Sequence, residues 1–296
     1  MLIDLYKHLR FAPLEEYQYV GLGSVAFVDF RMVHRSLGID TLLSIEGTDD
    51  PLEQARFVRN KPYDQIDLRF GHSSQVLPYI DFQRHSLVWL DYDNTARRSM
   101  VNDLATVAAK AKSGTFLALT FTNSFPTEGK AAVTALAHLK EGFPEFVPDD
   151  AQPLAYQGPR YAEFVRSVFG ALLDTALADA DAGVPDPLDR RYAFQVCYFK
   201  YKDGMQMATI GWIVVSERDI PTFELCRLEA LPFYRSGKRA FTINIPKVTP
   251  LEIREMERRL PSPETSDDLN WIPEDERRSF AQTYRYLPSF ASVEAI

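Results

Sequence analysis

The sequence predicts a three-layer α/β fold, in which helices cover both faces of a seven-stranded, mostly parallel sheet. Short apolar runs alternate with segments of helical periodicity, which is typical of right-handed βαβ units. A glycine-rich turn follows the first apolar run, and two long strand-like runs joined by Asp-Gly lie late in the chain. We therefore expect five parallel strands first and an antiparallel hairpin that closes the sheet.

The elements of the first half follow each other at short intervals. Residues 17–20 form the first expected strand, and a helix is expected from Ser24 to about Leu37, with Val25, Val28 and Met32 on one face. The run at 86–90 is apolar throughout, as in a strand that is buried on both faces. The remaining expected elements are strands at 41–45, 65–70 and 115–120 and a helix at 100–111.

The second half changes character after a long amphipathic helix at about 164–176. Strand-like runs at 192–201 and 205–216 flank the turn Lys202-Asp203-Gly204, where glycine accepts positive φ without steric cost. Residues 217–296 are expected to form a C-terminal helical extension that packs on the domain formed by residues 1–216. Within this extension, Thr249-Pro250-Leu251-Glu252 is a capping box that opens a helix to about Leu260.

Composition narrows the class of protein. The 296 residues are 46% hydrophobic and 25% charged, as in a globular protein, and the net charge of −8 argues against a nucleic-acid-binding surface. No apolar run reaches the roughly 18–20 residues that span a bilayer, and the N-terminal residues lack a signal-peptide pattern. The two cysteines, Cys197 and Cys226, fit a reducing compartment. We expect a cytoplasmic protein without a membrane segment.

The first candidate site is the turn Gly21-Leu22-Gly23-Ser24 between the first strand and its helix. Glycines let a backbone approach a ligand closely, and a helix N-terminus offers free N–H groups. Glu46 ends the next strand, where a carboxylate accepts hydrogen bonds from both ribose hydroxyls of a nucleoside. The alternative is a tight turn beside a solvated glutamate. The combination favours a nucleoside-binding site.

Two families share this beginning. The segment 21–26 fits the dinucleotide fingerprint G-x-G-x-x-A, and it also resembles the glycine motif of class I S-adenosylmethionine (SAM)-dependent methyltransferases. Those enzymes often carry an acid two residues before the first glycine, where this chain has Tyr19.

Three later segments favour the methyltransferases. The segments 70–78, 87–93 and 114–118 resemble, in that order, motifs of the catechol and caffeoyl-CoA type O-methyltransferases. The closing hairpin resembles their antiparallel seventh strand. The resemblance covers roughly residues 15 to 216.

This resemblance implies SAM as the cofactor and assigns residues to it. Gly21, Gly23 and Ser24 would line the methionine moiety, Glu46 would bind the ribose, and Asp91 would lie near the ammonium group or the acceptor. The adenine edge would contact Ser73 and Ser74. SAM carries a sulfonium and an ammonium group, so carboxylates are its natural counter-charges.

The chain departs from these relatives on the acceptor side. Their second metal-binding pair falls at Thr120 and Phe121, and their catalytic lysine falls at Asn94. A divalent cation needs several oxygen ligands, so no metal site is predicted. His72 is then the best candidate for a general base, with Asp93 and Asn94 as further acceptor-side residues.

The sequence thus predicts a metal-independent, O-methyltransferase-like enzyme that uses SAM to methylate an unidentified acceptor. Two alternatives stay open. One is a catalytically inactive methyltransferase-like module that binds a nucleoside, or a partner protein through the C-terminal extension. The other is an NAD(P)-dependent oxidoreductase that uses the same glycine turn.

Overall fold

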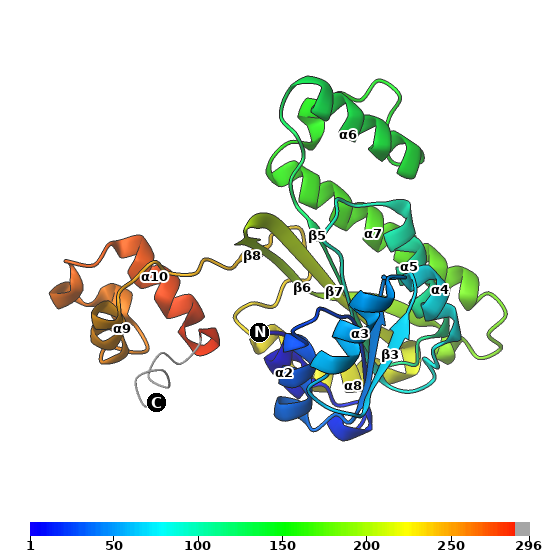
Figure 1. Cartoon of the computed structure of the whole chain (residues 1–296), viewed down its shortest axis with the longest axis horizontal. Helices are drawn as coiled ribbons and strands as arrows, with labels where there is room; N and C mark the ends of the chain where they lie inside the picture. Colours follow the sequence, from blue (N-terminus) through cyan, green and yellow to red (C-terminus); the bar gives the residue numbers. More distant parts are fainter. Residues whose placement is uncertain (288–296) are drawn as a thin grey trace. The chain divides into compact units, whose positions relative to one another are not determined.

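The fold is built on one eight-stranded sheet with the strand order β3-β2-β1-β4-β5-β7-β6-β8 (Figure 1). The computed structural model describes residues 1–287, apart from the side chain of Asp203. Neighbouring strands from β1 to β5 are parallel, and β7 is antiparallel to both β5 and β6. The strands are β1 (Gln18–Leu22), β2 (Thr41–Glu46), β3 (Ile66–Phe70), β4 (Ser86–Asp91), β5 (Thr115–Thr122), β6 (Arg191–Asp203), β7 (Met205–Ser216) and β8 (Phe241–Thr242).

The predicted fold class is confirmed, and the predicted number of strands is corrected from seven to eight. The additional strand, β8, has two residues. An element this short shows no alternation of apolar and polar side chains, and therefore it leaves no pattern in the sequence.

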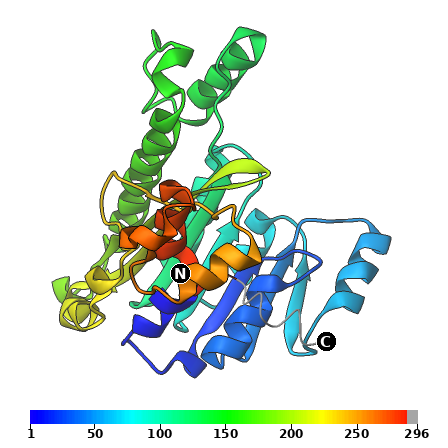
Figure 2. The same cartoon turned by 90° about the vertical axis from the view of Figure 1, so that its left-hand side faces the viewer.

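Helices cover both faces of the sheet, as Figures 1 and 2 show. Successive side chains of a strand point to opposite faces. Accordingly Tyr19 contacts Phe30 of α2 on one face, and Val20 joins the main core with α5 and α7 on the other. The helices are α1 (Leu2–His8), α2 (Val28–Leu37), α3 (Pro51–Asn60), α4 (Ser73–Val76), α5 (Arg98–Lys110), α6 (Gly129–Gly142), α7 (Pro159–Ala180), α8 (Ile220–Leu225), α9 (Pro250–Glu257) and α10 (Glu274–Thr283).

Helix α2 differs from its prediction in its start and in its buried face. It begins at Val28, four residues later than expected, after Phe27 adopts a left-handed conformation with φ of 48°. Val28 and Met32 are 57% and 45% exposed, while Phe30 and Val33 are buried. The rings of Phe27 and Phe30 bury more apolar area than Val28 and Met32 do, so they set the rotation of the helix about its axis.

The hairpin and the long amphipathic helix are confirmed. Gly204 connects β6 and β7 with φ of +65°, the left-handed conformation that the Asp-Gly signal predicts. Helix α7 has 22 residues and buries one face in the main core, including Val165, Val168 and Phe169.

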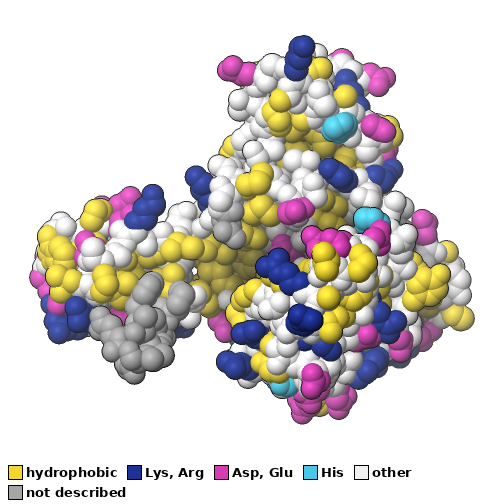
Figure 3. Space-filling model, viewed as in Figure 1, with side chains coloured by type: hydrophobic (Ala, Val, Ile, Leu, Met, Phe, Trp, Pro, Cys, Tyr) yellow, Lys and Arg dark blue, Asp and Glu magenta, His cyan; other side chains and the backbone are white. Residues whose placement is uncertain are grey.

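The segment around α6 extends past the carboxyl end of β5 (Figures 1 and 2). Phe143, directly after α6, packs against Phe169 of α7, with ring centroids 6.2 Å apart. Apolar side chains also reach the surface of this segment, where Val133 and Leu154 are 64% and 66% exposed, and yellow atoms show at this end of the space-filling view (Figure 3). The segment thus combines a packed base with a partly apolar surface.

The chain divides into two compact units, Met1–Phe241 and Thr242–Ile296. In the second unit the predicted capping box is confirmed: the Thr249 hydroxyl accepts from the backbone N–H of Glu252, and the Glu252 carboxylate accepts from that of Thr249. The small core of this unit contains Met256, Leu269, Ile272 and Phe280. The packing of the extension on the domain stays a prediction. None of the helices within residues 1–287 is long and apolar enough to cross a membrane.

Candidate functional site

The glycine turn and Glu46 come together at the carboxyl edge of the sheet. β1 lies between β2 and β4, and the backbone N–H of Gly23 donates to the carbonyl of Ile45 at 3.3 Å. A Cβ atom added to Gly23 would lie 2.0 Å from Oε1 of Glu46 and 2.2 Å from Oγ of Ser44. A side chain at this position would have to displace Glu46 or Ser44, so glycine allows the present close approach of these two elements.

Glu46 is buried rather than solvated. It is 3% exposed, and the Ser44 hydroxyl donates to Oε1 at 2.6 Å. Burial raises the pKa of Glu46 to about 7, although the hydrogen bond from Ser44 partly opposes this effect. The charge of Asp29 adds a smaller increase. The alternative of a tight turn beside a solvated glutamate is therefore wrong.

The structure adds Asp29, in the first turn of α2, which the sequence did not single out. The Tyr19 hydroxyl donates to Oδ2 of Asp29 at 2.6 Å, and a Cβ atom on Gly21 would lie 3.2 Å from the same oxygen. Burial raises the pKa of Asp29, although hydrogen bonds from Tyr19 and from the helix backbone partly offset it. The expected helix start at Ser24 placed Asp29 inside the helix, where it carried no signal of a site.

Two acids beside the turn, Asp29 and Glu46, have hydroxyl groups rather than cations as their side-chain partners. No ion pair to Asp29 or Glu46 forms among residues 1–287. Asp91 lies at the exposed end of β4. Burial is the main cause that raises the pKa of Tyr19, and the charges of Asp29 and, to a smaller extent, Asp91 raise it further. This edge of the sheet is electronegative and suits a cationic ligand.

The predicted adenine segment follows β3 directly. Ser73 begins α4, and its hydroxyl donates to Asp103 of α5 at 2.5 Å. The Tyr92 hydroxyl donates to the same carboxylate oxygen, also at 2.5 Å. Ser73 is thereby tied to α5, whereas His72 and Ser74 are exposed to solvent.

The acceptor-side candidates follow β4 in an exposed loop. The Asn94 amide donates to the Asp93 carboxylate at 2.6 Å, so the two side chains engage each other. Their backbone carbonyls accept from Thr122, at the end of β5, at 2.7 and 2.9 Å. The loop is thus fixed to the sheet through its backbone and presents its side chains outward. Ser24, in the glycine turn itself, is likewise exposed.

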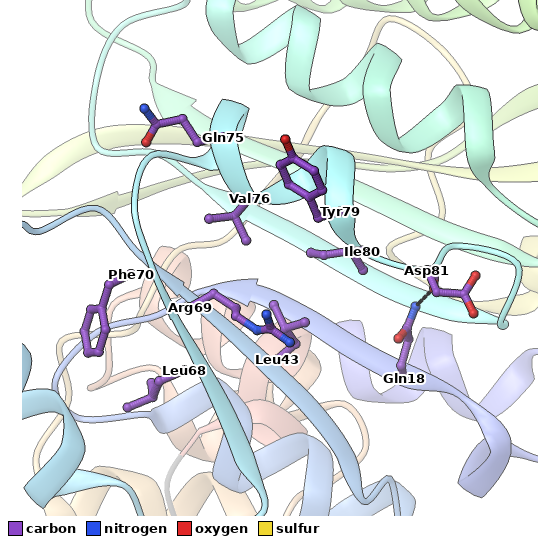
Figure 4. A pocket seen from close by; sticks show the side chains of 10 residues that line it. All are labelled: Gln18, Leu43, Leu68, Arg69, Phe70, Gln75, Val76, Tyr79, Ile80 and Asp81. Atoms are coloured by element: carbon purple, nitrogen blue, oxygen red, sulfur yellow. Dashed lines mark hydrogen bonds between the residues drawn. The ribbon is translucent and has the colours of Figure 1, made fainter.

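A separate pocket of about 530 Å³ lies over β1, β2 and β3, beside the short turns that follow β3 (Figure 4). Its wall includes Leu43, Val76 and Tyr79, and the Gln18 amide donates to the carbonyl of Asp81 at 2.6 Å at one end. None of its ten lining residues is one of the predicted site residues. The pocket therefore differs from the expected cofactor cleft. Among residues 1–287, no three His, Cys, Asp or Glu side chains group as metal ligands.

The sequence from residue 1 to 295 matches the family described as “Putative O-methyltransferase”. The chain belongs to this family, and the resemblance to class I SAM-dependent methyltransferases is confirmed. The strand order, with one antiparallel strand between β5 and β6, agrees with this class.

No curated protein matches the chain. Solved structures give distant likenesses. LepI in complex with S-adenosylhomocysteine (SAH) and a substrate analogue is 9% identical, with a TM-score of 0.40 over 71% of this chain and 46% of LepI. The tRNA methyltransferase TrmK of B. subtilis is 14% identical, with a TM-score of 0.36 over 73% and 66%. An O-methyltransferase family protein from Burkholderia thailandensis is 11% identical, with a TM-score of 0.34 over 73% and 55%.

The chain thus spans about half the length of LepI and of the Burkholderia protein. Family membership rests on the sequence match over residues 1–295.

Proposed function

We propose that the chain binds SAM at the carboxyl edges of β1, β2 and β4 and transfers its methyl group to an oxygen atom of an acceptor, without a metal ion. The observation that carries the proposal is the buried Glu46 carboxyl, packed against Gly23 without a cationic partner among residues 1–287. A nucleoside hydroxyl pair supplies donors to such a carboxylate, and the sulfonium and ammonium groups of SAM supply positive charge.

Each residue at this edge then has a defined task. Glu46 accepts from the ribose hydroxyls, and Gly21 and Gly23 allow the methionine moiety to approach the backbone. Asp91 lies at the end of β4, beside the turn, and contributes negative charge. His72 and Ser74, in the loop after β3, are exposed and lie in the segment assigned to the adenine.

The bound cofactor supplies an electrophilic methyl group on sulfur. The chain holds the acceptor oxygen in line with that methyl group, and alignment of this kind supplies several kcal/mol of barrier reduction. A base is required only when the acceptor proton is tightly held, and His72 is the candidate for that step. Asp93 and Asn94, which lie in a loop fixed to β5, would contact the acceptor.

Titration of the full-length protein with SAH tests the cofactor assignment. Wild-type protein should bind in the micromolar range, and Glu46→Ala should weaken the affinity at least tenfold, about 1.4 kcal/mol. Asp64→Ala, an exposed acid before β3, is the matched control and should leave the affinity unchanged. Absence of binding by the wild-type protein, or equal weakening by both variants, would overturn the assignment.

A second candidate is a module that binds the nucleoside without transferring a methyl group. It is favoured by the Asp93–Asn94 pair, whose side chains bond to each other where the metal-dependent relatives carry a lysine. In that case SAH binds, no acceptor is methylated, and the C-terminal extension is the proposed contact for a partner protein. A cytoplasmic location is part of both proposals, because Cys197 and Cys226 are free thiols.

A further inference from the structure

A partly buried acid, Asp29, lies beside the glycine turn and contacts a tyrosine hydroxyl. Oδ2 of Asp29 and the Tyr19 hydroxyl lie 3.2 and 3.1 Å from the position that a Cβ atom of Gly21 would take. Because Gly21 has no side chain, both groups reach the underside of the turn. Asp29 keeps part of its surface exposed.

Besides burial, the charge of Asp29 contributes to raising the pKa of three groups on different elements: Tyr6 of α1, Tyr19 of β1 and Glu46 of β2. The charge of Asp91, at the end of β4, acts on Tyr19 as well. Backbone N–H groups in the first turn of α2 also donate to Asp29. Helix N-termini commonly stabilise a carboxylate in this way, but the helix does not account for the bond from Tyr19, which holds the carboxylate toward the turn.

We propose that Asp29, held by the Tyr19 hydroxyl, binds the α-ammonium group of SAM. This inference rests on the proposed function and names the residue that neutralises the ammonium charge. In this chain Tyr19 occupies the position, two residues before Gly21, at which an acid of β1 would point to the same place. In this chain the carboxylate of Asp29 comes from α2 instead, and the hydrogen bond from the Tyr19 hydroxyl holds it at that place.

Binding of a cation at this position should change the number of protons that the protein holds. Burial raises the pKa of both Asp29 and Glu46, and the charge of Asp29 adds to the increase at Glu46. An ammonium group between them favours the ionised forms. Binding of the ligand near pH 7 therefore releases protons, and the release should shrink when Asp29 becomes asparagine.

Two adenosine ligands separate the ammonium from the rest of the cofactor. SAH carries the amino acid moiety, whereas 5′-methylthioadenosine lacks it but keeps the ribose and adenine. Asp29→Asn should weaken SAH binding at least tenfold and change methylthioadenosine binding less than twofold. Tyr19→Phe should show the same selectivity with a three- to fivefold effect on SAH, and Glu46→Ala should weaken both ligands.

The outcomes distinguish this inference from the proposed function. If wild-type protein binds neither ligand, the proposed function fails. If wild-type protein binds both, but Asp29→Asn weakens them equally or not at all, the assignment of Asp29 is overturned while the proposed function stands. Should Asp29→Asn unfold, Tyr19→Phe decides by the same comparison. Calorimetry at pH 7 in two buffers of different ionisation enthalpy gives the proton release, which must decrease in Asp29→Asn.

Discussion

The two ends of the sheet both bury acids, but they treat the charge in opposite ways. At the amino end, Asp181 is 5% exposed and pairs with Arg191, 15% exposed, at 2.5 Å. The same guanidinium donates to the carbonyls of Ala108 and Ala111 at the end of α5, at 3.1 and 2.6 Å. The Arg191 side chain thus satisfies an acid and a helix C-terminus together.

At the carboxyl end, Asp29 and Glu46 receive side-chain hydrogen bonds from the neutral hydroxyls of Tyr19 and Ser44. Burying a carboxyl without a cation costs free energy unless it is protonated, which is why the pKa of each is raised. A chain gains nothing in stability from such an arrangement. The paired acid thus contributes to the fold, whereas Asp29 and Glu46 are the acids for which we propose a ligand that brings the missing charge.

The largest effect is expected at the amino end. Arg191→Met should lower the free energy of unfolding by about 3–5 kcal/mol, because it leaves Asp181 buried without its partner and the α5 carbonyls without a donor. Urea denaturation measures the loss. Arg218→Met is the control, since its pairs with Asp186 and Asp189 are exposed and contribute less than about 1 kcal/mol. Similar losses in both variants would contradict the distinction.

Gly23→Ala should give the next largest change, at the carboxyl end. The new methyl group collides with the Glu46 carboxyl and the Ser44 hydroxyl, so we expect a stability loss of about 1–3 kcal/mol. Displacement of Glu46 should also remove measurable SAH binding. Thermal unfolding and titration calorimetry provide the two readouts.

Gly47, directly after β2, offers a matched control at the same edge of the sheet. A Cβ atom there meets nothing within 4 Å, so Gly47→Ala should bind SAH like the wild-type protein and unfold at a similar temperature. If both alanine variants bind normally, Glu46 does not need its present position for the ligand.

The features that the sequence could predict depend on residues close together in the chain or on the direction of the strands. The strands, the hairpin and the capping box at Thr249 depend on residues close together in the chain, and their patterns are local. The glycine turn and Glu46 could also be paired in advance, because parallel strands bring their carboxyl ends to one edge.

The missed features depend on packing between elements. Asp29 reaches Tyr19 only because Phe27 turns left-handed and delays α2, which rotates the helix onto Phe30. Ser73 meets Asp103, thirty residues further along the chain, only after α4 and α5 pack together. No local pattern contains these contacts.

The smallest expected effect concerns pH. The pKa of Glu46 in the folded protein, about 7, lies above the usual value of 4.5, so the folded state holds the proton over this range while the unfolded state loses it. The free energy of unfolding should therefore fall as pH rises from about 4.5 to 7 and stay lower above it. Glu46→Gln removes this cost and should stabilise the free protein at pH 8 by about 2 kcal/mol.

The stabilisation should disappear at pH 4, where Glu46 is protonated in both states. Glu16→Gln, an exposed acid in the turn before β1, is the control and should change stability little at either pH. Urea denaturation at pH 4 and pH 8 gives all four values. If Glu46→Gln destabilises the protein at pH 8, the carboxylate has a counter-charge at this edge. The contrast with Arg191 and Asp181 would then fail, because both ends of the sheet would hold compensated acids.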